Sequence, residues 1–235
     1  MFPPNSEARL FDLSHSFSHS KIKAVIGMFH GRAKGNIADE RNHLAKLVEF
    51  PTNTIAYGHQ IHSSIVREVD TSGYVGDGDG LITKASEVVL TIQVADCVPL
   101  FVYSCDSGAI GLFHAGWRGV IAGIVEEGIL NMVNQFNTAP NQLEAVLGPS
   151  IGSCCYEIRE DVSTYFPDLF LRKKNREHSF LDLPGFVKEK LMSTGITADN
   201  IFMDGRCTFC SEEHFHSFRR DGDAAGRIIC FLGRM

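Results

Sequence analysis

Three short apolar segments near the middle of the chain constrain its fold more than any other feature. Residues 88–94, 98–103 and 109–113 are rich in β-branched and other apolar side chains, which is typical of buried strands. The helical pattern VIAGIVEEGILNMVNQF follows soon after, despite Gly123 and Gly128. The stretch GLFHAGWRG, which joins the third segment to this pattern, is therefore predicted to be a strand end, a glycine-bearing turn and a helix start.

The rest of the chain alternates between strand-like and helix-like patterns. Apolar residues recur at helical spacing over residues 37–50, with acidic residues early and Lys46 late, as suits the helix dipole. The other expected elements are strands at 64–70, 143–147, near 200–204 and near 227–232, and a helix at 183–193. This mixture of hairpin-like and helix-linked strands favours mixed sheets. Because no repeat or flexible linker interrupts the chain, we expect one domain over residues 1–235.

The composition argues against several classes of protein. Hydrophobic residues make up 44% and charged residues 21% of the chain, as in an ordinary globular protein. The formal net charge of −6 argues against a basic face for nucleic acid. The start, MFPPNSEARL, lacks a signal-peptide pattern, and Asp96 and Pro99 interrupt the longest apolar region, residues 88–103. We therefore expect a cytoplasmic protein that neither spans a membrane nor binds nucleic acid.

One cysteine and several histidines stand at the edges of predicted strands. Cys97 lies in VADCVPL, His114 ends the strand before the glycine turn, and His59 and His62 precede the strand at 64–70. Since cytosolic thiols stay reduced, metal binding, catalysis or burial explains cysteines better than disulfides do. His62, Cys97 and His114 fit a catalytic zinc site, which keeps three protein ligands and one open position. His59 is nearly as good a ligand as His62, and a simply buried Cys97 is the alternative.

Asp96 adjoins Cys97 inside apolar sequence. A carboxyl group in such surroundings needs a partner or a shifted pKa. It could orient a ligand histidine from behind, or it could cap the neighbouring turn, and the sequence leaves both interpretations open.

Two further pairs of cysteines raise the question of a second site. Cys207 and Cys210 form CTFC, which suggests half of a zinc ribbon or a redox pair, but no second half follows at the required spacing. Cys154 and Cys155 are adjacent, and an extended chain would place their thiols on opposite faces. We therefore expect at most one of these two thiols to reach a site, and a second metal is the less favoured interpretation.

The sequence offers arginines for anion binding but no phosphate-binding glycine motif. The acidic stretch VGDGDGL lacks the spacing of a calcium loop, so it predicts a turn. Guanidinium groups suit bidentate contacts with phosphate or carboxylate, although surface salt bridges are the alternative for each of them. The available cluster consists of Arg118, Arg219, Arg220 and Arg227.

Several motifs together resemble one known family. QIH at 60–62, DGL at 79–81, ADCVPL at 95–100, HAGWRG at 114–119, GPSIGSCCYE at 148–157 and FRRDGDAAGR at 218–227 occur in the order seen in the YfiH-like family. This family is also called the laccase-domain or multicopper polyphenol oxidoreductase family, and its members are described as purine nucleoside phosphorylases. The resemblance runs from about residue 55 to the C-terminus. One departure is Ser63, which stands where the family usually has glycine.

The resemblance implies a fold, a metal and an activity. The fold would be a single α+β domain of layered helices and mixed β-sheets, with zinc held by His62, Cys97 and His114. The activity would be phosphorolysis of adenosine, inosine, guanosine and methylthioadenosine, with adenosine deamination in addition. The partners would be purine nucleosides and phosphate, and the protein a monomer or homodimer.

The resemblance and the chemistry of the residues together suggest roles for further side chains. We expect Cys97 and Asp96 to take part in catalysis, and Asp96 and His59 are the candidates for the general acid. Trp117 would pack behind the turn or stack on a flat base. The residues expected to contact substrate are His59, Gln60, Arg118 and Arg220.

Three other functions use the same residues. Copper in place of zinc would give a laccase-like polyphenol oxidase, since thiolate and imidazole suit copper, although a multicopper oxidase needs many more histidines. Cys97 as nucleophile with His114 as base would give a cysteine hydrolase, which metal at the sulfur would exclude. A purely structural zinc would give a non-enzymatic binding module.

Overall fold

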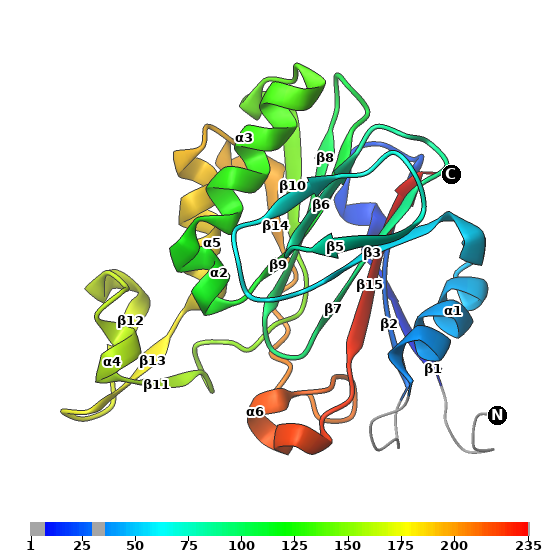
Figure 1. The fold of residues 1–235 in the computed structure, drawn as a ribbon. Coiled ribbons are helices and arrows are strands. Elements are labelled where there is room, and N and C mark those ends of the chain that lie inside the picture. Colours follow the sequence, from blue (N-terminus) through cyan, green and yellow to red (C-terminus); the bar gives the residue numbers. More distant parts are fainter. Residues whose placement is uncertain (1–7, 30–35, 235) are drawn as a thin grey trace.

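Two six-stranded mixed sheets lie face to face at the centre of the molecule (Figure 1). The computed structural model describes residues 8–29 and 36–234. The first sheet has the order β1 (Ala8–Asp12), β2 (Ile22–Phe29), β15 (Ile228–Arg234), β7 (Val89–Val94), β3 (Ile55–His59), β5 (Gly73–Asp77). The second has the order β14 (Ile201–Met203), β10 (Leu143–Leu147), β8 (Val98–Ser104), β9 (Ile110–Ala115), β6 (Gly80–Thr83), β4 (Val66–Glu68). Each sheet contains both parallel and antiparallel pairs.

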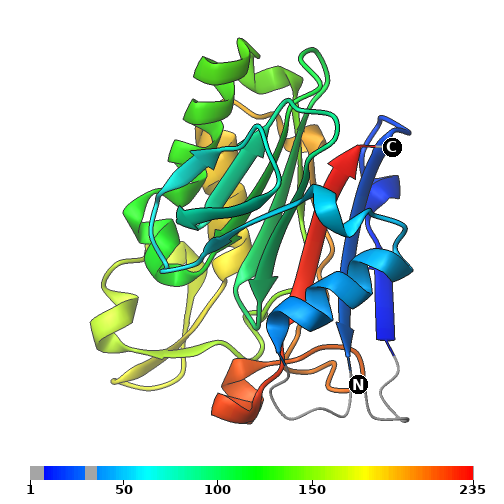
Figure 2. The same cartoon turned by 45° about the vertical axis from the view of Figure 1, so that its right-hand side comes forward.

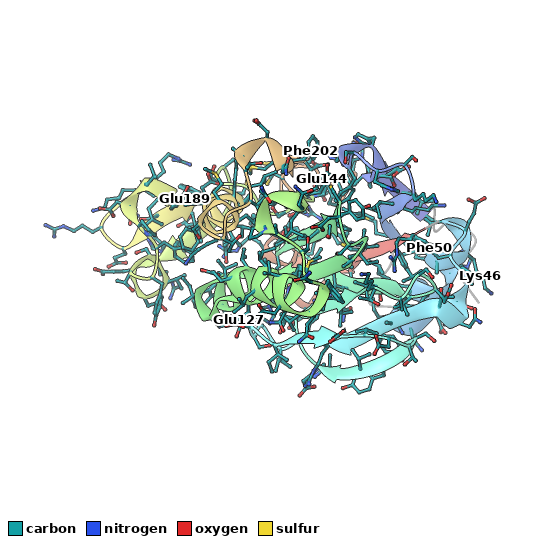
Figure 3. The ribbon with its side chains drawn as sticks, turned by 90° about the horizontal axis from the view of Figure 1, so that it is seen from above. Lys46, Phe50, Glu127, Glu144, Glu189 and Phe202 are labelled. Atoms are coloured by element: carbon teal, nitrogen blue, oxygen red, sulfur yellow. The ribbon has the colours of Figure 1, made fainter. Side chains whose placement is uncertain are left out.

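Helices cover the outer faces of both sheets. Helix α1 (Ile37–Leu47) crosses the first sheet (Figure 2), whereas α2 (Trp117–Ala122), α3 (Ile124–Phe136) and α5 (Leu183–Ser193) cover the second. Seen from above, Lys46 of α1 lies on one side and Glu127 of α3 and Glu189 of α5 on the other (Figure 3). The chain is thus built in four layers, helix, sheet, sheet, helix, which confirms the predicted fold class of layered helices and mixed sheets.

Smaller elements lie at the ends of these layers. A three-stranded antiparallel sheet projects beside α5, with the order β11 (Glu157–Arg159), β13 (His178–Leu181), β12 (Leu171–Lys173). The short helices are α4 (Glu160–Ser163), next to β11, and α6 (Phe218–Asp221), which precedes β15.

Strand alternation places a hydrophobic core in each of the three interfaces between layers. In β7, Leu90 and Ile92 pack between the two sheets, while Val89 packs under α1. In β9, Leu112 lies between the sheets and Phe113 lies under α3, beside Gly111 and Gly128, where a Cβ would come within 2.8 and 2.6 Å of the Phe113 ring. Central strands buried on both faces need continuous apolar sequence, which explains why these segments were the clearest strand signals.

Most expected elements are present, with shifted ends. The predicted strands at 88–94, 98–103 and 143–147 and the helix at 183–193 correspond to β7, β8, β10 and α5. The helix expected after HAGWRG is divided into α2 and α3, because Gly123 adopts a φ of +95° and ends α2. The N-terminal strands β1 and β2, the strands β3, β5 and β6, and the three-stranded sheet were not predicted.

No helix in the described part of the chain is both long enough and apolar enough to cross a bilayer. Residues 1–7, which belong to the segment without a signal-peptide pattern, lie outside the described residues.

Candidate metal centre and active site

The chain crosses from the first sheet to the second through the three residues that join β7 to β8, Ala95, Asp96 and Cys97. Asp96 adopts a φ of +85°, a left-handed conformation that is uncommon outside glycine and occurs in tight, over-determined turns. The crossing therefore holds Cys97 at the end of the space between the two sheets.

His114 reaches the same place from β9. Alternate residues of a strand face one side, so His114 faces the way of Ile110 and Leu112, which pack between the sheets. His62 lies in the loop after β3, with a φ of +59°, and its ring centroid is 4.8 Å from that of His114. The donor atoms of His62, Cys97 and His114 all lie within 4.8 Å of one another. The structure thus brings together the three side chains selected from the sequence.

Asp79 holds both histidines in place. One oxygen of its buried carboxylate accepts the His114 Nδ1–H at 2.7 Å and the backbone N–H of His62 at 3.0 Å. The other oxygen accepts the backbone N–H groups of Ile61 and Ser63, at 3.2 and 2.7 Å, and the Ser63 hydroxyl at 2.8 Å. Because His114 Nδ1 is occupied, Nε2 is the nitrogen left for a metal.

The charges of the site support one another. Burial raises the pKa of the Cys97 thiol, but the imidazoles of His114 and His62 outweigh burial and bring that pKa down to about 6. Burial lowers the pKa of His114, but Cys97 and Asp79 raise it to about 9. Burial raises the pKa of Asp79, but hydrogen bonds from His114 and Ser63 outweigh burial and lower this pKa to about 2. Cys97 is thus favoured as a thiolate, the form that binds metals.

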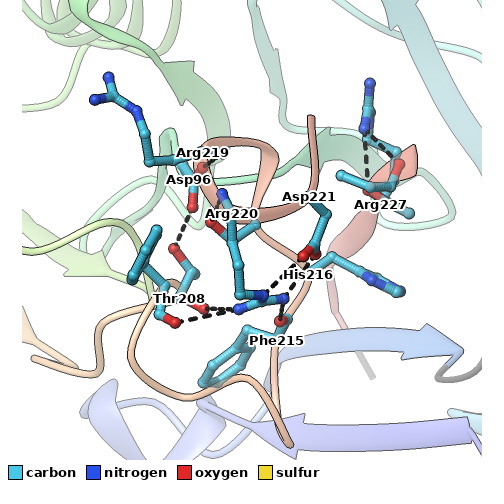
Figure 4. A network of polar contacts seen from close by, with 12 residues as sticks. Asp96, Thr208, Phe215, His216, Arg219, Arg220, Asp221 and Arg227 are labelled. Atoms are coloured by element: carbon cyan, nitrogen blue, oxygen red, sulfur yellow. Dashed lines mark hydrogen bonds and ion pairs between the residues drawn. The ribbon is translucent and has the colours of Figure 1, made fainter. Parts of the chain in front are cut away.

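The sequence predicts Asp79 only as part of a turn and of the DGL motif at 79–81, with no role beside the metal ligands. The available signal was an acidic residue directly before the buried strand β6, because a buried carboxylate requires partners. Among the described residues, Asp96 is hydrogen-bonded to no histidine. Its carboxylate accepts the Thr208 hydroxyl and the backbone N–H of Arg219 in the first turn of α6, both at 2.6 Å (Figure 4).

Gly116, directly before α2, gives the three candidate ligands the room they need. A Cβ at this position would lie 2.8 Å from Cys97 Sγ, closer than real Cβ atoms come to their neighbours, and 3.0 Å from His62 Cδ2, an unusually tight contact. The expected close approach of the HAGWRG turn to the site is therefore present, and any side chain at Gly116 would displace the candidate ligands.

A cavity of about 630 Å³ opens onto His62, Cys97 and His114. Its wall includes five residues with aromatic or amide side chains, Gln60, Gln93, Trp117, Tyr156 and Phe218, and three arginines, Arg118, Arg219 and Arg227. Trp117 also packs against the core beneath the second sheet, so it lies both behind the turn and beside the cavity. Tyr156 was not expected. Burial raises the pKa of its hydroxyl, so this group stays protonated.

The three arginines differ in their contacts. The Arg118 guanidinium lies 4.4 Å from the Trp117 ring and has no carboxylate partner among the described residues. Arg227 donates to the neighbouring carbonyls of Ala225 and Gly226 at 3.1 and 3.0 Å. Arg219 donates to the Glu157 carbonyl at 2.5 Å. Their charge faces a cavity large enough for a small anionic ligand.

Three residues expected at the substrate have other contacts. His59 lies on the surface, paired with Asp77 at 3.0 Å, outside the cavity wall. Arg220 also lies outside the wall, because its guanidinium donates to Asp221 and to the carbonyls of Thr208, Phe209 and Phe215 (Figure 4). Gln60 lines the cavity, but its amide is bonded to the backbone of Gln93 in β7 at 2.7 and 2.8 Å.

Comparison with known proteins places the chain in a family. The family model described as multi-copper polyphenol oxidoreductase laccase matches residues 18–235. The chain belongs to this laccase family. The predicted YfiH-like resemblance is thereby confirmed.

Curated proteins and solved structures resemble most of the chain. The chain is 31% identical to purine nucleoside phosphorylase YlmD of Geobacillus stearothermophilus, over 89% of this chain and 82% of the relative. It is 33% identical to a purine nucleoside phosphorylase of Deinococcus radiodurans, over 84% of this chain and 77% of that relative. The crystal structure of YlmD from Geobacillus stearothermophilus superimposes with a TM-score of 0.86 at 28% identity, over 92% of both chains. The crystal structure of the YfiH protein of Bacillus licheniformis superimposes with a TM-score of 0.84 at 25% identity, over 92% of this chain and 94% of that one.

Ser63, the residue after His62, has a structural role. Its hydroxyl donates to Asp79, and it also accepts the backbone N–H of Ile65 at 3.2 Å. The Ser63 side chain therefore adds contacts to the loop that carries His62.

A second cluster of possible ligands lies outside the cavity wall. Cys154, Cys155, Cys207 and Cys210 have sulfur atoms within 4.8 Å of one another. The expectation that at most one of the adjacent cysteines reaches a site was wrong. The chain is not extended there, because the N–H groups of Cys155 and Tyr156 both donate to the Gly152 carbonyl in a tight turn.

Proposed function

We propose that this protein is a zinc-dependent purine nucleoside phosphorylase. Its substrates would be adenosine, inosine, guanosine and methylthioadenosine, with adenosine deamination as a further activity. The observation that carries the proposal is the joint position of a three-residue metal site and three arginines on one cavity. The printed names of relatives at about 30% identity, which match most of both chains, point to the same class of enzyme.

The residues fit a catalytic metal. Two imidazoles and one thiolate form an open three-ligand set, and the Asp79 contact with His114 is the carboxylate–histidine arrangement common behind zinc ligands. A zinc ion held by His62, Cys97 and His114 would polarise a substrate oxygen or lower the pKa of water for the deaminase reaction.

The arginines suit the phosphate. In phosphorolysis a phosphate oxygen forms a bond to C1′ of the nucleoside while the C1′–N bond breaks, and the electron pair leaves with the purine, which takes up a proton. The guanidinium of Arg118 would hold the phosphate, supported by the charges of Arg219 and Arg227. Fixed donors that face the reacting anion need no reorganisation during the reaction.

The remaining wall suits a purine nucleoside. Trp117 and Phe218 offer aromatic faces for stacking on a base. The protonated hydroxyl of Tyr156 can donate a hydrogen bond, and because its acidity is suppressed by burial it would act as a positioning group rather than as an acid. Asp96 accepts hydrogen bonds from Thr208 and from the backbone of Arg219, so it would hold the segment that carries Arg219 at the cavity rather than carry a proton itself.

Copper-dependent phenol oxidation is the second candidate, because the description of the family names it. Of the two possible ligand groups found among the described residues, one contains histidine. A single set of two imidazoles and one thiolate can bind one copper ion, but a multicopper oxidase needs further histidine-rich sites.

The deciding experiment measures phosphate-dependent release of free base and ribose 1-phosphate from adenosine and inosine. The wild-type protein would be loaded with zinc or with copper and compared with Cys97→Ala and with Cys105→Ser, an exposed cysteine outside both clusters. We expect equal amounts of both products with zinc, and none with Cys97→Ala. Oxidation of a phenol by the copper form without phosphorolysis by either form would favour the second candidate. A folded zinc protein without either activity would favour a zinc-stabilised binding module.

A further inference from the structure

The cluster of four cysteines has the spacing of a metal site. Cys210 Sγ lies 3.5 Å from the sulfur of Cys154 and 3.2 Å from that of Cys155, and all four sulfurs lie within 4.8 Å of one another. Four thiolates in tetrahedral geometry around zinc, with bonds of about 2.3 Å, are about 3.8 Å apart. The sulfur–sulfur distances in the cluster therefore lie around the value that a four-thiolate zinc site requires.

The backbone brings these cysteines together from two distant segments. Residue Ser150 forms a parallel bridge with Cys207, in which Ser150 N–H donates to the Arg206 carbonyl and Thr208 N–H donates to the Ser150 carbonyl. The turn after Gly152 then directs the next two cysteines toward this bridge. The cluster is therefore held by main-chain contacts that do not depend on a disulfide.

The sulfur of Cys207 already has the surroundings of a thiolate ligand. The backbone N–H of Gly152 donates to it at 3.3 Å. Main-chain N–H groups that donate to sulfur stabilise the charged form required by metals. A Cβ at residue 152 would lie only 3.3 Å from Cys154 Sγ, so glycine permits this approach.

An ion can reach the cluster from solvent. Cys154 and Cys210 are exposed, and Cys155 and Cys207 are half-buried. A divalent cation bound there would hold the four thiols as thiolates, because a coordinated thiol is deprotonated outright.

We propose that Cys154, Cys155, Cys207 and Cys210 bind a second zinc ion in a closed, structural four-thiolate site. This site is separate from the three-ligand set at the cavity and does not depend on the proposed activity.

The second zinc would fasten two loops that form the cavity. Thr208, between the two cysteines of CTFC, donates its hydroxyl to Asp96, and its carbonyl accepts from Arg220 (Figure 4). On the other loop, Ile151 and Tyr156 flank the adjacent cysteines and line the cavity. Closed zinc sites contribute folding free energy directly, so the ion would fix the cavity wall without touching a substrate.

The test counts zinc per chain in protein purified with zinc and a reductant, using elemental analysis. We expect two zinc ions in the wild type and in Cys105→Ser, and one in Cys210→Ser. Cys97→Ser, which removes a ligand of the other site, is expected to keep one. Wild-type zinc content in Cys210→Ser, or complete loss of zinc in Cys97→Ser, would overturn the proposal.

A second measurement leaves all four cysteines intact, so it does not rely on the folding of Cys210→Ser. Cys97→Ser protein, stripped of zinc, is titrated with Co²⁺ alone, and thiolate-to-cobalt charge-transfer absorption is recorded. We expect this absorption to saturate at one ion per chain and to be reversed by Zn²⁺. Absence of thiolate-to-cobalt absorption would refute the second site. A protein mass lower by two hydrogens for each pair of cysteines, measured under reducing conditions, would show disulfides in the cluster and would also refute it.

Discussion

Replacement of Asp79 by asparagine tests the arrangement behind the candidate metal ligands. The carboxylate accepts five hydrogen bonds, from His114 and from the loop that carries His62. An asparagine side chain keeps one acceptor oxygen but has an NH₂ group in place of the other. This NH₂ group would face N–H or O–H donors and could not accept their hydrogen bonds. Hydrogen bonds to a charged group contribute about 1.5–3 kcal/mol, so the loss of one or two costs about 3 kcal/mol.

The acidity of Asp79 gives a second value for the same effect. Its pKa is about 2 instead of 3.8, with a side chain fully shielded from solvent, and each unit of pKa corresponds to about 1.4 kcal/mol. The depressed pKa means that the charged form stabilises the fold by about 2 kcal/mol at neutral pH. This contribution is complete above about pH 4 and is lost as the pH falls through about 2.

The assay combines urea denaturation with zinc affinity measured by chelator competition. We expect Asp79→Asn to lose about 2–3 kcal/mol of unfolding free energy and ~10–100-fold of zinc affinity, the usual cost of removing a group that orients a ligand. The matched control is Asp77→Asn, two residues away, whose exposed side chain is paired with surface His59. It should change stability by less than about 0.5 kcal/mol. Zinc affinity within twofold of wild type in Asp79→Asn would refute the reasoning.

Three further predictions concern the same cavity. Gly116→Ala should lower zinc affinity by at least about tenfold in the same competition assay, because its Cβ would come within 2.8 Å of Cys97 Sγ. Arg118→Ala should raise the KM for phosphate about tenfold or more, with a smaller change in kcat, while the nucleoside KM stays near wild type; an unchanged phosphate KM would remove Arg118 from the anion site. Arg220→Ala should lower the unfolding free energy by about 2–4 kcal/mol in urea, since it leaves three carbonyls and Asp221 without their donor.

The sequence predicted the parts of the fold in which periodicity and burial agree. The strands β7, β8 and β10 are mostly apolar because both of their faces are covered, and α5 has clear ends. By contrast, β5, with Gly73 and Gly76 at positive φ, and the three-residue strands β11 and β12 have too few apolar side chains to give a pattern. Their pairing is set by contacts with distant strands, which a local window does not contain.

The candidate site also contains residues that the sequence indicated and residues that it did not. His62, Cys97 and His114 could be selected because residues able to bind metals stand out at the ends of apolar strands. Asp79 was hidden in a glycine-rich turn, and its role depends on a partner 35 residues away in the chain. The contacts of Arg220 and the convergence of Cys154 with Cys155 depend on loop conformation, which residue type alone does not specify.

The crossing of the chain between the sheets at residues 95–97 has a consequence for folding. The donor atoms of the three-residue site come from a loop of the first sheet, from the crossing itself and from a strand of the second sheet. They can meet only after the two halves of the sandwich have docked, so they form a long-range contact that is completed late. An ion bound there acts mainly on the reverse reaction: it slows unfolding of the finished protein more than it speeds folding. Such an ion would therefore lengthen the lifetime of the native state more than it would raise the folding rate.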